Sequence, residues 1–140
     1  MIAYLDTSAF VKLVVHEQGS AEVATVWQNA DRRISSVVLY PEARAAIGRA
    51  RRMGRLRRHS LSSARRQIEA LWAVVDHFEL SEPLARLAGE LAEHHGLRAY
   101  DAVHLASAVA AADAELVLVA ADGDLLAAAR RLGLATARLP

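Results

Sequence analysis

Four acidic residues stand where a strand is expected to end or a helix to begin. Asp6 follows the apolar stretch IAYL directly, and Asp122 comes just after the apolar stretch LVLV. Glu42 and Asp101 lie near the starts of two segments that are expected to be helices. In a parallel α/β sheet, ligand sites lie outside the carboxyl ends of the strands. We therefore expect the four carboxylates to converge at one edge of a sheet.

Carboxylates gathered in this way favour a metal site. They cannot all stay ionised without a counter-charge, and the sequence offers no lysine nearby to supply one. A hard divalent cation prefers oxygen ligands, so Mg²⁺ or Mn²⁺ fits best, as one or two ions. Such ions activate water for in-line displacement at phosphorus. Thr7 and Ser8, next to Asp6, are expected to hold a carboxylate or a metal-bound water by hydrogen bonds.

Each acid also has a simpler explanation. Asp6, Asp101 and Asp122 are each well placed to be a helix N-cap, because aspartate is among the best capping residues. Taken singly, the N-cap is the better explanation of each, and Glu42 is readily explained as a surface residue. The four together favour a shared site.

Apolar periodicity predicts the elements that must position these acids. Helices are expected over 7–15, 20–29, 39–53, 60–78, 81–95, 100–113 and 124–133, with Ser20 and Ser81 as N-caps. Strands are expected over 2–5, 33–38, 78–80, 115–121 and 135–138. Because strands and helices alternate throughout, the fold class is α/β, a three-layer α/β/α sandwich around a mainly parallel sheet of four to five strands.

Composition limits the class of protein. The 140 residues suit one domain, 54% of them are hydrophobic, and there is no cysteine for a disulfide or a thiolate metal site. The start MIAYLD does not resemble a signal peptide, and no apolar run approaches the length of a membrane span. We therefore expect a soluble, cytoplasmic protein.

Positive charge is concentrated in one segment. Nine arginines and no acid lie between Arg44 and Arg66, although the net charge of the whole chain is only +1. Arginine binds phosphate in planar, bidentate contacts, so this segment favours a phosphate-rich or acidic partner over a merely solvated face. If the helix from residue 39 continued far enough, one face would carry four of these side chains, Arg44, Arg51, Arg55 and Arg58.

Four segments of the sequence resemble those of a known family. YLDTSAFVKL, SSVVLYPEARAAIGRA, GLRAYDAVHLASA and LVLVAADGDLLAAARRLGL, in this order, are similar to segments of PIN-domain proteins. The resemblance is strongest to VapC-type toxins of bacterial toxin–antitoxin pairs. It covers essentially the whole chain and implies a single PIN domain over 1–140.

The resemblance also implies a function. It implies a metal-dependent endoribonuclease that cleaves structured cellular RNA, forms a homodimer and is inhibited by a cognate VapB-like antitoxin. The family's acidic positions correspond to Asp6, Glu42, Asp101 and Asp122, with Asp124 as a candidate fifth acid. The arginine segment is then expected to contact RNA or the antitoxin. Ala120 departs from the pattern, because that position commonly carries a threonine or serine hydroxyl.

Two other interpretations stay open. A PIN-fold module without catalysis, acting only in complex assembly, would share the fold, and Ala120 weakly favours it. His104 lies three residues after Asp101, on the same side of the expected helix, so it would either assist the site or pack as a hydrogen-bonded core residue. The core role is the simpler expectation.

Overall fold

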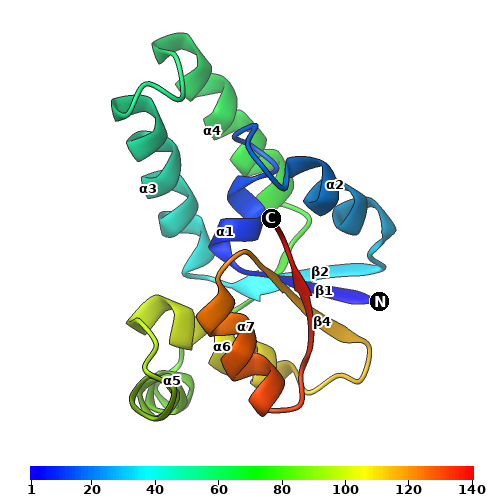
Figure 1. Cartoon of the computed structure of the whole chain (residues 1–140). Helices are drawn as coiled ribbons and strands as arrows, with labels where there is room; N and C mark the ends of the chain where they lie inside the picture. The colour runs from blue at the N-terminus through cyan, green and yellow to red at the C-terminus, as the bar shows by residue number, and fades with distance from the viewer.

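A computed structural model of the chain describes residues 1–140, apart from the side chain of His59. Its centre is a five-stranded sheet in the order β3-β2-β1-β4-β5, with every neighbouring pair parallel (Figure 1). The strands are β1 (Ile2–Leu5), β2 (Arg32–Ser36), β3 (Asp76–Phe78), β4 (Leu116–Ala120) and β5 (Ala135–Arg138). The predicted α/β class and parallel sheet are confirmed.

Helices connect these strands. They are α1 (Thr7–Val11), α2 (Ser20–Asn29), α3 (Leu39–Arg52), α4 (Arg58–Trp72), α5 (Glu82–His95), α6 (Ala99–Ala111) and α7 (Gly123–Arg131). None of these described helices is both long enough and apolar enough to cross a bilayer.

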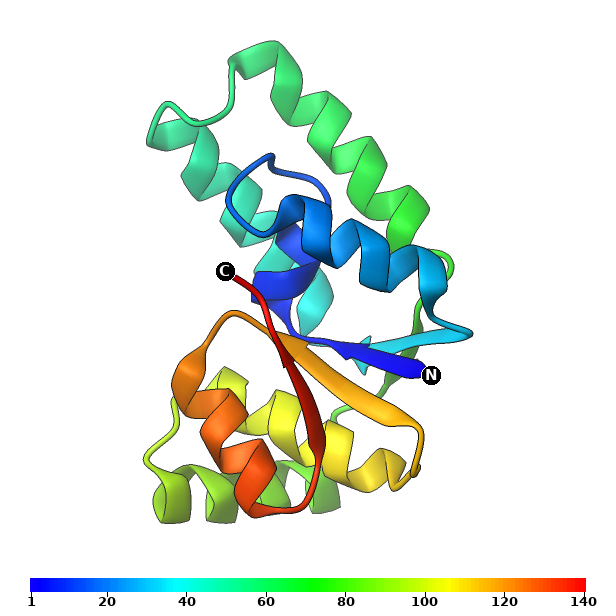
Figure 2. The same cartoon turned by 45° about the vertical axis from the view of Figure 1, so that its right-hand side comes forward.

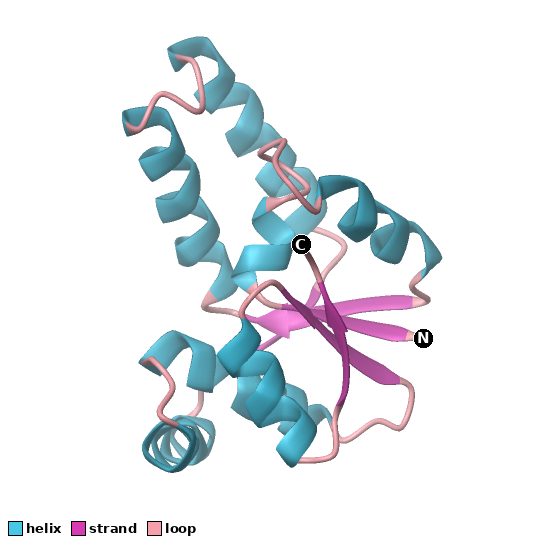
Figure 3. Cartoon of the chain, viewed as in Figure 1, coloured by secondary structure: helices cyan, strands magenta, loops and turns pink.

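The side-chain alternation along β1 explains the layers. Ile2 and Tyr4 face one side of the sheet and pack in an apolar cluster with residues of α6 and α7, whereas Ala3 and Leu5 face the other side with residues of α1 and α2. Helices therefore cover both faces of the sheet, as expected for a parallel sheet whose central strands, β1 and β4, are almost fully buried (Figure 3).

Two long helices extend beyond the sheet. Figures 1 and 2 show α3 and α4 as a hairpin that projects from the layer containing α1 and α2. An apolar cluster that includes Phe10, Leu39, Ile47 and Ile68 joins this hairpin to α1. The arginine-rich segment, Arg44–Arg66, covers most of α3, the hairpin turn and the first half of α4.

The hairpin turn interrupts the helix, so the four arginines expected on one helix face do not share one. The helix ends at Arg52, Gly54 takes a left-handed φ of 75°, and the Arg55 N–H bonds back to the carbonyl of Ala50. A residue at positive φ cannot continue a right-handed helix. Arg44 and Arg51 therefore lie on α3, Arg55 lies in the turn, and Arg58 begins α4.

Several expected helix ends also differ. The first helix ends at Val11 instead of residue 15, and α4 ends at Trp72, after which Asp76–Phe78 pair with β2 as a strand. Gly19, not Ser20, is the N-cap of α2. Ser81 caps α5 as predicted, because its hydroxyl accepts the N–H of Leu84.

Candidate active site

All four predicted acids line one pocket of about 460 Å³ at the carboxyl end of the sheet. Asp6 follows β1 and Asp122 follows β4, which are neighbouring strands at the point where the strand order reverses direction. Glu42 comes from the first turn of α3 and Asp101 from the first turn of α6. The fold therefore brings these four side chains to one pocket, as predicted.

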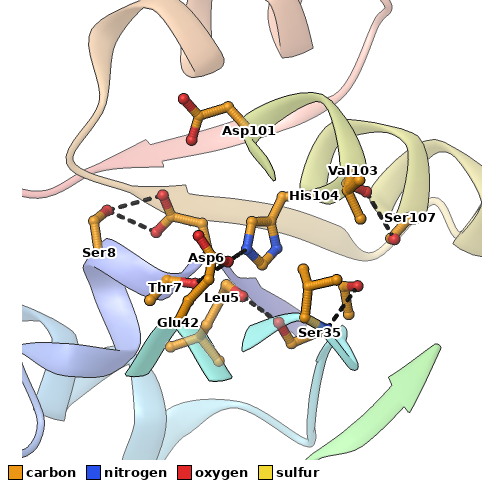
Figure 4. Close-up of polar contacts among 12 residues, drawn as sticks. Leu5, Asp6, Thr7, Ser8, Ser35, Glu42, Asp101, Val103, His104 and Ser107 are labelled. Carbon is orange, nitrogen blue, oxygen red and sulfur yellow. Dashed lines mark hydrogen bonds and ion pairs between the residues drawn. The ribbon is translucent and has the colours of Figure 1, made fainter. Parts of the chain in front are cut away.

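Asp6 is the buried member of the group, with only 3% of its surface exposed. It caps α1 by accepting the Ala9 N–H at 2.9 Å, and the Ser8 hydroxyl donates to its carboxylate at 2.7–2.8 Å (Figure 4). Burial raises its pKa to about 6, although His104, the Ala9 N–H and the Ser8 hydroxyl oppose the rise. Asp6 thus both caps α1 and lines the pocket.

Ser8 also connects two strands of the site. Its Oγ accepts the backbone N–H of Ala121 at 3.1 Å, just beyond the end of β4. One hydroxyl therefore supports the Asp6 carboxylate and holds the chain that leads into Asp122.

Glu42 is held by a chain of hydrogen bonds that ends in the core. Thr7 Oγ1 donates to Glu42 Oε1 at 2.6 Å, and His104 Nε2 lies 2.9 Å from the same oxygen. Burial raises the pKa of Glu42, but the hydrogen bonds from His104 and Thr7 outweigh it, so the pKa lies below its usual value. This carboxylate stays ionised in a fixed orientation.

The hydrogen bonds around His104 indicate that its Nε2 carries a hydrogen. The single hydroxyl proton of Thr7 goes to Glu42, so Thr7 accepts at 3.1 Å from His104 Nε2, which must carry hydrogen. Burial raises the pKa of Tyr4, so its phenol keeps its proton, and the phenol oxygen lies 3.0 Å from His104 Nδ1. His104, 1% exposed, is both the expected core histidine and a support for Glu42.

Asp101 and Asp122 share a cation that sequence reasoning missed. Arg98 Nε lies 3.1 Å from Asp101 Oδ2, and its Nη2 lies 3.5 Å from Asp122 Oδ2. Burial raises the pKa of Asp101, against the effect of this arginine. An arginine, three residues before Asp101, therefore supplies the counter-charge for which the sequence offers no lysine.

Of the two other acids expected as helix N-caps, one is a cap and one is not. Asp122 caps α7, because its Oδ1 accepts the N–H groups of Asp124 and Leu125 at 2.8 and 3.1 Å. Asp101 is not a cap, since it is the third residue of α6 and Arg98 holds the capping position.

The donor set suits a hard divalent cation, because its four anionic groups are all carboxylates. In the part of the chain that the structure describes, no three histidine, cysteine or acidic residues are gathered closely enough to hold one ion together. Figure 4 shows why: Asp101 stands apart from the Asp6 and Glu42 contacts. The chemistry of the pocket fits Mg²⁺ or Mn²⁺, provided that the carboxylates draw together around the ion.

Other predicted residues lie outside this pocket. Asp124 is exposed on α7, and Ala120 is fully buried in the apolar cluster with Tyr4 and Leu125. Four of the arginines, Arg44, Arg51, Arg55 and Arg58, do not line it either. Arg44 instead donates to the Tyr40 hydroxyl at 2.8 Å.

Two further residues of the pocket wall were not predicted as site residues. Arg49, on α3, lines the pocket two turns after Glu42. Tyr100, beside Asp101, also lines it and is 59% exposed. The i, i+7 spacing of Glu42 and Arg49 on one helix is the pattern by which Arg49 could have been found.

Comparison with known proteins identifies the family. The PIN domain model matches residues 3–131, so the chain belongs to the PIN-domain family. Within that family its curated relatives are named ribonucleases VapC, which confirms the resemblance seen in the sequence. Ribonuclease VapC49 of Mycobacterium tuberculosis is 42% identical over 132 residues, which cover 94% of this chain and 92% of the relative.

Solved structures share the fold. The toxin VapC20 of Mycobacterium tuberculosis, described as cleaving the sarcin-ricin loop, matches with a TM-score of 0.70 at 21% identity, over 90% of this chain and 94% of that one. VapBC-5, a toxin–antitoxin structure from the same organism, matches with a TM-score of 0.65 at 19% identity, over 98% of each chain. At these identities the likeness extends to the fold alone.

Proposed function

We propose that this protein is a metal-dependent endoribonuclease of the VapC type. The observation that carries the proposal is the single pocket in which carboxylates from four elements meet around the buried Asp6. The ribonuclease names of relatives at 42% identity support it. The proposed cofactor is Mg²⁺ or Mn²⁺, held by Asp6, Glu42, Asp101 and Asp122 as one or two ions.

Each residue has a defined part in this proposal. When bound, the ion supplies charge neutralisation and an activated water for attack on the phosphodiester. Ser8 orients Asp6, while Thr7 and His104 orient Glu42, so these two carboxylates are fixed before substrate arrives. Arg98 pairs with Asp101 and Asp122 from an exposed position, and a bound ion would take its place as their counter-charge.

The proposed substrate is structured cellular RNA. Support comes from the arginine-rich hairpin and from the likeness to a toxin described as cleaving the sarcin-ricin loop. The arginines proposed to contact RNA or the antitoxin are Arg44, Arg51, Arg55 and Arg58. We also propose a cytoplasmic homodimer inhibited by a VapB-like antitoxin, since VapBC complexes share the fold.

The test is cleavage of total RNA by the purified protein with and without EDTA. We expect EDTA to abolish cleavage and Asp6→Asn and Asp101→Asn each to lower it at least about a hundredfold, because each removes a charged ligand from the pocket. Asp76→Asn is the matched control, since Asp76 is an exposed acid that pairs with Arg32 outside the pocket.

Two results would contradict the proposal in different ways. Cleavage that survives in both pocket variants would show that the site is wrongly assigned. If wild-type protein cleaves no RNA but still binds its antitoxin, the chain is the binding module without catalysis.

A further inference from the structure

A second pocket of opposite charge adjoins the acidic one. It measures about 190 Å³ and lies between α1, the α1–α2 loop and the outer part of α3. Four residues line both pockets, namely Thr7, Ser8, Ala46 and Arg49. The two pockets are therefore neighbouring parts of one groove, with Arg49 on their shared wall.

The positive charge of this second pocket comes from Lys12, Arg49 and Arg55, against one acid, Glu17. Glu17 is shared, because Lys12 Nζ lies 3.3 Å from its Oε1 and Arg55 Nη1 lies 3.4 Å from its Oε2. No ion pair of Arg49 occurs among the described side chains. Three cations and one carboxylate leave an excess of positive charge facing the pocket.

Lys12 is built into the wall of this pocket. Its side chain is only 10% exposed, and its ammonium donates to the Gln18 carbonyl at 2.8 Å. Gly19, at φ 92°, leaves room for it: a Cβ there would lie 3.1 Å from Lys12 Cδ. The α1–α2 loop thus holds a nearly buried cation in place, and an ammonium has a third N–H to offer. Figure 2 shows this loop beside the α3–α4 hairpin.

We propose that this pocket binds the phosphate next to the scissile phosphodiester of an RNA strand. The proposal rests on the ribonuclease function proposed above. When one phosphodiester lies among the carboxylates, the adjacent phosphate of the same strand has to lie within one nucleotide along the groove, and the basic pocket is the part of the groove that suits it. Arg49 lines both pockets, and a guanidinium matches phosphate geometry.

An acidic peptide is the other ligand that this charge would attract. The continuity with the acidic pocket favours RNA, because a strand that presents one phosphodiester to the carboxylates of the proposed site has a second phosphate for the basic pocket, whereas an acidic peptide has no group for the acidic pocket to bind. Exposed arginines on the hairpin add attraction along the rest of the strand.

The test measures RNA binding in EDTA, so that it does not depend on cleavage. A fluorescein-labelled single-stranded oligoribonucleotide, which contains the cleavage site mapped with wild-type protein, is titrated at several salt concentrations. We expect Arg49→Ala to weaken binding about tenfold at low salt and to reduce the salt slope by about 0.7, the value for one phosphate contact with a single strand. Arg49→Lys should restore part of the affinity. Arg130→Ala, which removes the same charge from α7 outside both pockets, is the control.

Chemical substitution then locates the contact. A neutral methylphosphonate replaces the phosphate on either side of the cleavage site, one side at a time. One of the two RNAs should bind wild-type protein more weakly, by a factor similar to that of Arg49→Ala, and should lose nothing further with the variant.

The outcomes are distinguishable. Equal losses in Arg49→Ala and Arg130→Ala, or no coupling with either methylphosphonate, would overturn the subsite but leave the ribonuclease proposal intact. Weaker antitoxin binding by Arg49→Ala with unchanged RNA binding would assign the pocket to an acidic peptide. A wild-type protein that neither binds nor cleaves RNA would overturn both proposals.

Discussion

At the scale of single residues, burial in the folded protein destabilises the ionised form of the Asp6 carboxylate. Its carboxylate is almost completely buried, and its pKa rises from 3.8 to about 6. The folded protein therefore binds the Asp6 proton more tightly than the unfolded chain does. Asp6 thus lowers the free energy of unfolding as pH rises from about 4 to about 6, and the loss persists at higher pH.

This gives a prediction for the metal-free protein. In EDTA, the free energy of unfolding of wild type relative to Asp6→Asn should fall by about 2.4 kcal/mol between pH 4 and pH 7, because one pKa unit corresponds to about 1.4 kcal/mol and most of the shift from 3.8 to about 6 falls in this range. Asparagine retains the oxygen that caps α1. Urea denaturation at four pH values measures the difference, and a constant difference would show that Asp6 titrates normally.

The acids of the pocket were predictable from the sequence, but some of their partners were not. The four acids could be found because each follows a strand or begins a helix, and the topology of a parallel sheet brings such positions together. The partnership of Arg98 with Asp122 could not, because it depends on where two distant loops meet. The hydrogen bonds of His104 depend in the same way on Tyr4, which lies 100 residues away in the chain.

At the scale of elements, several expected bounds agree with the structure. The strands Ile2–Leu5 and Ala135–Arg138 and the capped helix that follows Ser81 match the expected positions. The end of α4 was misplaced, because the apolar run after Trp72 continues the helical pattern. Pairing of Asp76–Phe78 with β2 prevailed over that pattern, and a three-residue strand carries little signal of its own.

The Ser81 cap provides a test at this scale. α5 packs against α6, which carries Asp101 and His104, so the stability of α5 supports the pocket. Ser81→Ala should lower the free energy of unfolding by about 1 kcal/mol, because the Leu84 N–H loses its acceptor, whereas Ser81→Gly should cost only a few tenths. Chemical denaturation distinguishes the two, and equal losses would argue against a capping role for the hydroxyl.

At the scale of the whole molecule, the proposed homodimer is directly testable. Light scattering of the purified chain should give a mass twice the 15.2 kDa of one copy, and the mass should not depend on EDTA, because the pocket lies within one chain. A mass of one copy at micromolar concentration would contradict the dimer and leave the pocket unaffected.

The strand order also bears on when the protein becomes competent during its synthesis. β1 lies at the centre of the sheet, yet one of its two partners is β4, the next-to-last strand to leave the ribosome. Asp122 and the Ala121 N–H that binds Ser8 come directly after β4. A nascent chain therefore has no complete acidic pocket until β4 and the segment that follows it have been translated. For a protein proposed to cut RNA, this order of synthesis means that a chain stopped before β4 would lack the proposed site.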